Sequence, residues 1–428
     1  MEMDFTPTGY SLVCLADGHE FEDQGWTLAD PECKTPSLVR ASYVSREFTP
    51  RDGHEGLYRY SDWLPIKRTL KGSCAPKTYK SAALTKELGL ENLYITFSGY
   101  WPKIGAEMQT CSFKETEAYS VCGRLDSDRI LVVASAGNTA RAFAKVCSDN
   151  NIPLLLSIPE DNIDALWFSE PLNDCVKIIA SPKGSDYFDA IALADKVCTD
   201  SRFLAEGGAK NVARRDGMGT TLLSAVETIG RIPDAYFQAI GSGTGTIAVW
   251  ENNLRLIEDG RWGTHKMRLY PSQNAPFTIM YDSWKLRSRK LVPMTPEQAR
   301  QASAEIDAKV LSNRKPPYSL AGGLFDAMQD AGGEIFKVTN EELHHWKKKF
   351  LELEGIDIHN AAAVATASLA AAVSEGKVSK DEVIMLNITG GGEELAKKDR
   401  EIFYAKPHLV LDPAMPAEEI VEKTIGLF

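Results

Sequence analysis

The chain has 428 residues, of which 43% are apolar and 25% charged, and this composition excludes collagen-like and largely disordered proteins. At roughly 150 residues per domain, the length predicts two or three domains. Lys and Arg number 48 and Asp and Glu number 59, which gives a net charge of −11. Because nucleic-acid phosphates need a basic face, we expect no general binding to nucleic acid.

No segment is typical of a membrane or secreted protein. The longest apolar run, residues 361–373, contains Thr366 and Ser368 and is shorter than the roughly 20 residues that span a bilayer. The first residues are acidic and lack the basic and apolar regions of a secretory signal. The eight cysteines include no Cys-x-x-Cys pair, so we expect reduced thiols, no metal, no membrane partner and a cytoplasmic location.

In the first half of the chain, the sequence pattern changes near residue 90 from irregular to one that predicts regular strands and helices. Residues 1–60 are rich in turn-forming dipeptides and predict an irregular segment. A strand is expected at 93–97, and the Ser-x-x-Glu pattern of Ser112 and Glu115 predicts a helix that begins at Ser112. Apolar runs and helical patterns then alternate, which predicts strands at 129–134, 151–158 and 176–180 and helices at 139–147 and 187–198.

The second half repeats this alternation. A strand at 235–240 leads into a glycine-rich loop and a helix at 246–258. Thr339 and Glu342 predict the capped start of another helix, and a late strand is expected at 382–387. Strands that alternate with helices predict the α/β class, with a mainly parallel sheet covered by helices on both faces.

Three strand-to-helix junctions, at 135–139, 241–246 and 389–392, are polar or glycine-rich. In parallel sheets such junctions lie at the carboxyl ends of the strands, where ligands bind. The sharpest is Gly241-Ser242-Gly243-Thr244-Gly245. Its glycines would let the backbone approach an anion, and the hydroxyls and the helix N-terminus would donate hydrogen bonds to it. The loop therefore predicts a phosphate cradle, although a tight turn would use the same glycines.

Other single residues are ambiguous by themselves. Lys114, in the first turn of a helix beside Phe113, has surroundings that favour a neutral amine and suit Schiff-base chemistry. Taken alone, it is more simply interpreted as an ordinary exposed lysine. Asn138 is interpreted most simply as a helix N-cap, and Thr389 as a cap or turn residue. Thr246 occupies the place where a dinucleotide-binding loop needs glycine, which disfavours a nicotinamide dehydrogenase.

Together and in this order, the motifs resemble the pyridoxal-phosphate enzymes of fold type II, the group of tryptophan synthase β and threonine synthase. Ser112-Phe113-Lys114 is similar to the motif that carries the Schiff-base lysine. The loop Ser135-Ala136-Gly137-Asn138-Thr139 is similar to the one that receives the substrate carboxylate, with the asparagine beside the cofactor. The resemblance assigns Gly241 to Gly245 to the cofactor phosphate and Thr389 to the pyridine nitrogen.

Within this group the chain most resembles the cysteate synthase family, through the runs at 97–102, 111–115, 132–144 and 211–220. The likeness covers about residues 36–400. It implies a large cofactor-binding domain from residues 61–120 and 205–428, and a small domain from residues 121–204. Residues 1–60 resemble a degenerate zinc-ribbon-like module in which only Cys14 and Cys33 remain, so we expect no metal there.

The resemblance implies β-replacement on O-phosphoserine, in which sulfite displaces phosphate and cysteate is formed. Lys114 would carry pyridoxal 5′-phosphate and remove the α-proton. Because both substrates are anionic, basic residues must face the cofactor. The candidates for substrate binding are Ser135, Ala136, Gly137, Thr139, Trp101, Lys103, Arg141, Arg214 and Arg215.

Two alternatives to this reaction remain open at this point. One is a threonine synthase, or another phospho-amino-acid lyase with a different nucleophile. The other is a catalytically silent relative, which the presence of Lys114, Asn138 and Thr389 disfavours. The resemblance also implies a homo-oligomer, a dimer or larger.

Overall fold

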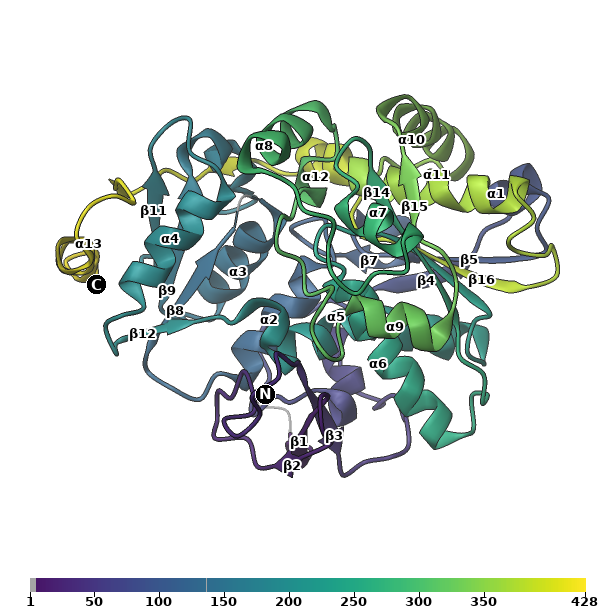
Figure 1. The fold of residues 1–428 in the computed structure, drawn as a ribbon, viewed down its shortest axis with the longest axis horizontal. Coiled ribbons are helices and arrows are strands. Elements are labelled where there is room, and N and C mark those ends of the chain that lie inside the picture. Colours follow the sequence, from purple (N-terminus) through teal and green to yellow (C-terminus); the bar gives the residue numbers. More distant parts are fainter. Residues whose placement is uncertain (1–4, 136) are drawn as a thin grey trace.

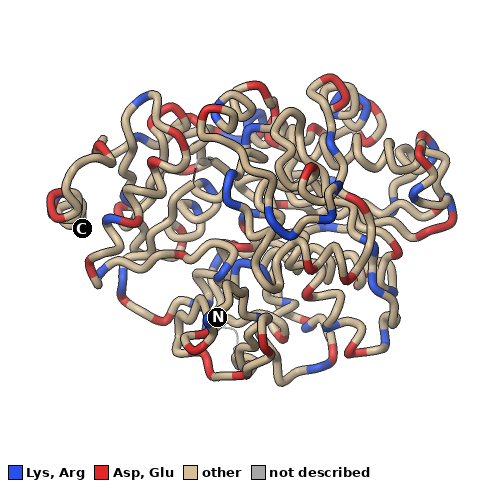
Figure 2. Tube along the Cα trace, viewed as in Figure 1, with Lys and Arg blue, Asp and Glu red and all other residues tan. Residues whose placement is uncertain are grey.

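Two twisted sheets with helices on their faces occupy the two halves of the computed structural model, which describes residues 5–135 and 137–428 (Figure 1). The chain is thus of the α/β class, as predicted. Basic and acidic residues are interspersed along its trace (Figure 2). Within the described residues, no helix has the length and apolar character needed to cross a membrane.

The larger sheet has six strands and is parallel except at one edge. Its order is β15 (Phe336–Val338), β14 (Arg268–Asn274), β13 (Ala235–Ala239), β16 (Val383–Ile388), β5 (Asn92–Phe97) and β4 (Lys77–Lys80), with β4 antiparallel. The helix α11 (Asn360–Ser374) packs against β13, β14 and β16, whereas α5 (Val212–Ile229) packs against β4 and β5. The helices α6 (Thr244–Asp259) and α2 (Lys114–Arg124) pack against α5.

The smaller sheet is parallel throughout, in the order β12 (Phe203–Ala205), β8 (Ile130–Ala134), β9 (Leu154–Pro159), β11 (Val176–Ser181) and β18 (Leu409–Val410). Side chains alternate along each strand, so Leu131 and Val133 share a cluster with Phe143 of α3 (Asn138–Asp149). The intervening Val132 packs with Leu193 of α4 (Tyr187–Val197) on the other face. Burial on both faces explains why these strands are predominantly apolar in the sequence.

The C-terminal segment departs from the predicted domains. We expected residues 205–428 to belong entirely to the large domain, but β18 extends the smaller sheet by pairing with β11. The last helix, α13 (Ala417–Ile425), places Ile420 in the apolar cluster of Leu193. Helix α13 is itself amphipathic and short, and the face of α4 offers the apolar partner that it needs.

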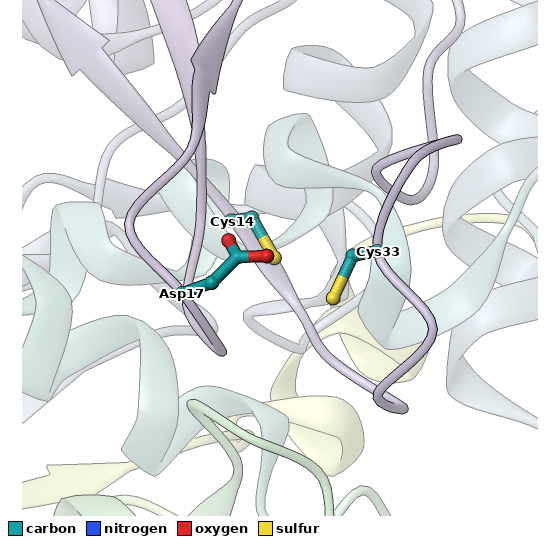
Figure 3. A group of neighbouring side chains, drawn as sticks. All are labelled: Cys14, Asp17 and Cys33. Carbon is teal, nitrogen blue, oxygen red and sulfur yellow. The ribbon is translucent and has the colours of Figure 1, made fainter.

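The N-terminal segment is more regular than predicted. It forms a three-stranded antiparallel sheet in the order β2 (Glu20–Phe21), β1 (Tyr10–Cys14) and β3 (Val39–Tyr43). The donor atoms of Cys14, Asp17 and Cys33 lie within 4.8 Å of one another (Figure 3). Cys14 and Cys33 are far apart in the sequence and Asp17 is not a thiol, so no Cys-x-x-Cys pattern marks this group; it offers three donors, where a structural zinc site has four.

One predicted helix start is wrong and another is confirmed. Helix α2 begins at Lys114 instead of Ser112, and the Ser112 hydroxyl has no hydrogen-bond partner among the described residues. Glu115 does not close a capping box, because its carboxylate accepts a hydrogen bond from the Thr110 backbone N–H instead. By contrast, Thr339 and Glu342 form the predicted capping box of α10 (Asn340–Glu354).

The remaining elements are short. They are β6 (Tyr100–Trp101), β7 (Ala106–Glu107), β10 (Trp167–Phe168), β17 (Phe403–Tyr404), α1 (Ala83–Leu88), α7 (Ile279–Lys285), α8 (Pro296–Glu305), α9 (Leu324–Ala331) and α12 (Glu393–Asp399), with 3-10 turns η1 (Gly56–Trp63), η2 (Pro102–Ile104), η3 (Glu160–Ala165), η4 (Gly208–Lys210) and η5 (Lys309–Leu311). All eight cysteines are free thiols.

Candidate active site

Two of the predicted site loops are joined by backbone hydrogen bonds. The Phe113 N–H donates to the Thr389 carbonyl at 2.9 Å, and the Gly391 N–H donates to the Cys111 carbonyl at 3.1 Å. The first loop precedes α2 and the second follows the carboxyl end of β16. Lys114 and Thr389, about 275 positions apart in the sequence, are thereby held next to each other.

Lys114 is the first residue of α2, and its side chain is 22% exposed. Its Nζ lies 4.8 Å from the centre of the Phe113 ring and 3.0 Å from Glu117 Oε2. Phe113 packs with Met218 of α5 and Ala248 of α6. Because Ala248 lies just beyond the first turn of α6, this packing sets the start of α2 beside the glycine-rich loop.

The glycine-rich loop leaves no room for side chains, as a phosphate cradle requires. Gly243 has a left-handed backbone (φ +79°), and a Cβ there would lie 2.9 Å from Leu324 Cδ2. A Cβ at Gly241 would lie 2.7 Å from the Val310 carbonyl oxygen. The loop ends at the N-terminus of the 16-residue helix α6, where free N–H groups and the helix dipole attract anions.

The hydroxyls of this loop also suit a phosphate group. Ser242 and Thr244 lie within hydrogen-bond distance of each other, at 2.8 Å between their oxygens. Thr246 Oγ1 is buried and has no hydrogen-bond partner among the described residues. Since an unsatisfied buried hydroxyl is costly, the donor set of this loop fits the phosphate of pyridoxal phosphate better than a simple turn.

The loop after β8 lies at the carboxyl end of a strand of the smaller sheet. The Gly137 N–H donates to Ser135 Oγ at 3.3 Å, and Ala136, predicted to bind substrate, lies outside the described residues. The N-cap of α3 is Gly137, so the interpretation of Asn138 as an N-cap is wrong. Instead, Asn138 Oδ1 accepts a hydrogen bond from Arg141 Nη2 at 3.1 Å. A Cβ at Gly137 would lie 3.8 Å from Val310 Cγ1, so Val310 connects this loop to Gly241.

The predicted arginines are already bound by protein groups. Arg141 is buried, donates to the carbonyls of Thr110 at 2.8 Å and Ala165 at 3.1 Å, and lies 4.4 Å from the Trp167 ring centre. Arg214 forms a two-pronged ion pair with Glu206 at 2.8 and 2.6 Å. Neither guanidinium has the free fork that a substrate phosphate would need.

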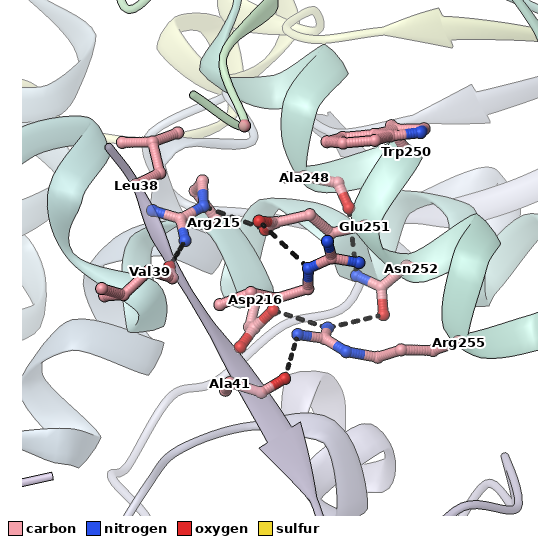
Figure 4. A network of polar contacts seen from close by, with 12 residues as sticks. Leu38, Val39, Ala41, Arg215, Asp216, Ala248, Trp250, Glu251, Asn252 and Arg255 are labelled. Carbon is pink, nitrogen blue, oxygen red and sulfur yellow. Dashed lines mark hydrogen bonds and ion pairs between the residues drawn. The ribbon is translucent and has the colours of Figure 1, made fainter. Parts of the chain in front are cut away.

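Arg215 requires a correction. It is fully buried and donates to Glu251 Oε2 at 2.9 Å and to the Val39 carbonyl (Figure 4). It also donates to the Ala209 carbonyl. The same network joins Asp216 to Arg255 at 2.7 Å. These contacts tie α5 and α6 to the N-terminal strand β3, so Arg215 holds the core together and does not face a substrate.

Trp101 and Lys103 also differ from their predicted roles. Trp101 is buried, and its ring packs edge-on against Phe97 and Tyr79 with centres 5.6 and 5.8 Å away. It is a core aromatic of the large domain and does not enclose the site. Lys103 is exposed in η2, on the turn between β6 and β7.

Three further ionisable groups at the site were not predicted from the sequence. His359 Nε2 lies 3.1 Å from Glu393 Oε2, and its backbone N–H donates to the Gly390 carbonyl at 3.0 Å, beside Thr389. Burial alone would raise the pKa of Glu393, but the neighbouring His359 and the charge of Arg141 outweigh it and hold that pKa well below its usual range. The third group is Glu117, one turn after Lys114. No local motif marks any of them.

Comparison with known proteins agrees with this geometry. Residues 79–390 match the family model described as pyridoxal-phosphate dependent enzyme. The chain is 44% identical over 415 residues to a cysteate synthase of Methanosarcina acetivorans, covering 96% of this chain and 99% of the relative. It is 45% identical over 420 residues to a cysteate synthase of Methanocella paludicola, covering 96% and 97%.

Solved structures show the same fold at much lower identity. Maize serine racemase superimposes with a TM-score of 0.58 at 15% identity, covering 76% of this chain and 90% of that one. Threonine deaminase isoform 2 from Solanum lycopersicum gives a TM-score of 0.55 at 17% identity, covering 76% and 82%. The family model and the full-length relatives together establish that the chain belongs to the cysteate synthase family of pyridoxal-phosphate dependent enzymes.

Proposed function

We propose that this enzyme replaces the phosphate of O-phospho-L-serine with sulfite, giving L-cysteate and inorganic phosphate. The observation that carries the proposal is the position of Lys114, joined through the Phe113–Thr389 hydrogen bond to the second site loop. The relatives named cysteate synthase, which match almost the whole chain, support the choice of reaction.

Four parts of the chain would hold pyridoxal 5′-phosphate. The loop Gly241 to Gly245, with the Thr246 hydroxyl, would bind its phosphate, and Lys114 would bind its aldehyde carbon covalently. Asn138 and Thr389 would contact the ring. When bound, the cofactor withdraws electrons from the α-carbon of an amino acid, which acidifies the α-proton and allows a β-substituent to leave.

The chain's own residues would then act at stated atoms. The amine of Lys114, once free, would accept the α-proton at Nζ, and Glu117 would balance the resulting charge. Thr389 would offer a hydroxyl, not a carboxylate, to the pyridine nitrogen, and a hydroxyl does not hold a proton there. This arrangement favours expulsion of a β-substituent over transamination.

The substrate is tested by steady-state kinetics in one buffer, with phosphate release as the assay and mass spectrometry to identify the amino acid formed. We expect kcat/KM to be higher for O-phosphoserine with sulfite than for O-phosphohomoserine with water. A preference of tenfold or more for the homoserine ester, about 1.4 kcal/mol in transition-state binding, would instead identify a threonine synthase.

We also propose that the enzyme works as a homo-oligomer in the cytoplasm. The eight free thiols support a reducing compartment. Light scattering coupled to gel filtration gives the oligomeric state directly, and a monomeric mass for the active holoenzyme would contradict this proposal.

A further inference from the structure

Glu117 is a fully buried carboxylate one helical turn after Lys114. Its Oε2 lies 3.0 Å from Lys114 Nζ, and its Oε1 lies 3.4 Å from Arg214 Nη1. Oε1 makes no hydrogen bond to the described residues. The carboxylate forms ion pairs with two cations, Lys114 through Oε2 and Arg214 through Oε1. A buried carboxylate of this kind persists only when neighbouring charges compensate for its lost hydration.

The charges around Glu117 alternate in sign. Arg214 is held on its other side by Glu206, whose side chain is only 6% exposed. Burial alone would raise the pKa of Glu117, but Arg214 and then Lys114 outweigh it and lower that pKa. Lys114, Glu117, Arg214 and Glu206 therefore form a line of alternating charges that runs from the site into the interface of α2 and α5.

The neighbouring Glu115 shows what burial does without such partners. It is also buried, but no cation forms an ion pair with it among the described residues. Burial raises the pKa of Glu115 to about 7. The pKa values of two glutamates two positions apart in one helix thus shift in opposite directions. The difference comes from the two cations that form ion pairs with Glu117.

Lys114 cannot stay in one charge state during the proposed reaction. While its nitrogen is bonded to the cofactor, it is a weaker partner for Glu117, and Arg214 keeps that carboxylate ionised. When the amine is free it can act as a base, and once it has accepted a proton it is an ammonium group. Because Glu117 is already ionised and buried, it stabilises the ammonium form without any rearrangement of charge.

We propose that Glu117 is a positioning residue that holds the Lys114 amine toward the site and stabilises its ammonium form after proton transfer. In that transfer the proton moves from the substrate α-carbon to Nζ, and the electron pair of the C–H bond stays on the substrate. Arg214 and Glu206 keep Glu117 ionised throughout. The proton's source rests on the proposed function, whereas the pairing of Glu117 with Lys114 does not.

The pairing is tested on apoprotein, without any amino-acid substrate. Covalent uptake of pyridoxal phosphate requires a neutral amine, so the uptake rate, followed by visible absorption, rises with pH. We expect E117Q to reach half-maximal uptake at a lower pH than the wild type, because glutamine offers no carboxylate to pair with the ammonium form of Lys114. E115Q, which removes the other buried carboxylate of this helix, should titrate as the wild type does.

A merely structural role would give another result. If folded E117Q, checked by circular dichroism and melting temperature, has the same uptake midpoint as the wild type, the proposal is overturned. E117D keeps the charge but shortens the side chain, so its midpoint should fall between those of E117Q and the wild type. Should E117Q not fold, E117D decides: a lowered midpoint supports the pairing and an unchanged one refutes it.

Turnover then tests the catalytic step separately. With O-phosphoserine and sulfite, E117Q should lose at least tenfold in kcat while KM for O-phosphoserine stays within about threefold, because Glu117 touches the base and not the substrate. An equal loss through KM alone would contradict the role in proton transfer. If neither variant nor wild type uses O-phosphoserine, the proposed function fails, and the uptake midpoints still decide whether Glu117 pairs with Lys114.

Discussion

Arg314, in the segment that follows η5, forms an ion pair with Asp186, which directly precedes α4 beside the smaller sheet. Asp186 is the N-cap of α4 in the small domain, and Arg314 also lies 4.1 Å over the ring centre of Phe188 in the same helix. Four positions before Arg314 is Val310, which lies beside both Gly241 and Gly137. The pair therefore links the segment beside the glycine-rich loop to the start of α4.

Breaking this pair should affect cofactor retention more than stability. The two side chains are 20% and 34% exposed, and partly exposed pairs contribute about 0–1 kcal/mol. We expect R314A to melt within a few degrees of the wild type but to release pyridoxal phosphate several-fold faster, measured by absorption after gel filtration. R300A, which removes an exposed pair on α8, is the control. A release rate equal to that of the wild type would show that the segment does not depend on Arg314.

Gly243 is predicted to be essential for binding the cofactor phosphate. In G243A the new Cβ would occupy a left-handed backbone and lie 2.9 Å from Leu324 Cδ2. Left-handed geometry costs a non-glycine residue roughly 1–2 kcal/mol, so we expect about a 5- to 30-fold rise in the Kd for pyridoxal phosphate as the loop shifts. The measurement is a titration of apoprotein with pyridoxal phosphate, followed by absorption.

The matched control for Gly243 lies at the other end of the same helix. Gly260 also has a left-handed backbone, at φ +75°, but nothing lies within 4 Å of a Cβ placed there. G260A should lose a similar amount of stability and keep the wild-type Kd. If both variants bind the cofactor equally well, the loop is a turn and not a cradle.

Much of the fold could be predicted because local sequence patterns indicate most of its strands and helices. The strands β8, β9 and β11 each lie within a few residues of the predicted bounds, since burial on both faces makes them mostly apolar, with Ser157, Lys177 and Ser181 as the polar positions. The start of α2 was misplaced because the Glu115 carboxylate accepts its hydrogen bond from the N–H of Thr110, five residues earlier, and not from the N-cap backbone as a capping box requires. The return of the C-terminus to the small sheet has no local signal at all.

The candidate site residues also fall into those that a local sequence pattern indicates and those that only the folded structure brings together. Residues within short motifs, such as Lys114 and the loop 241–245, could be proposed as site residues from the sequence. Arg215 could not be separated from Arg214, because the two are adjacent and only the helix geometry sends one to Glu251 and the other to Glu206. His359 and Glu393 come from separate elements, and only packing around Thr389 brings them together.

Lys114 is predicted to be the lysine that carries the cofactor. Borohydride reduction of the holoenzyme followed by peptide mapping should place the pyridoxyl mass on the peptide that contains Lys114. K114A should bind pyridoxal phosphate reversibly and lose turnover, whereas K103A, which changes an exposed lysine of the preceding turn, should label as the wild type does. Label on Lys103 or any other lysine would refute the assignment.

The last prediction concerns the pH dependence of stability. Burial raises the pKa of Glu115 from 4.5 to about 7, so between these values the folded protein binds a proton that the unfolded chain has lost. This group therefore stabilises the fold fully below pH 4.5, and that contribution is lost as pH rises to about 7. The shift corresponds to roughly 3 kcal/mol at 1.36 kcal/mol per unit.

E115Q isolates this contribution because glutamine does not titrate. Its amide oxygen can still accept the hydrogen bond from the Thr110 N–H. In urea unfolding at pH 5, 6, 7 and 8, all other titrating groups are common to both proteins and cancel in the difference. The free energy of unfolding of wild type minus that of E115Q should fall by up to about 3 kcal/mol from pH 5 to pH 8. A difference that stays constant with pH would mean that Glu115 is ionised in the fold, and that water or a cation reaches it.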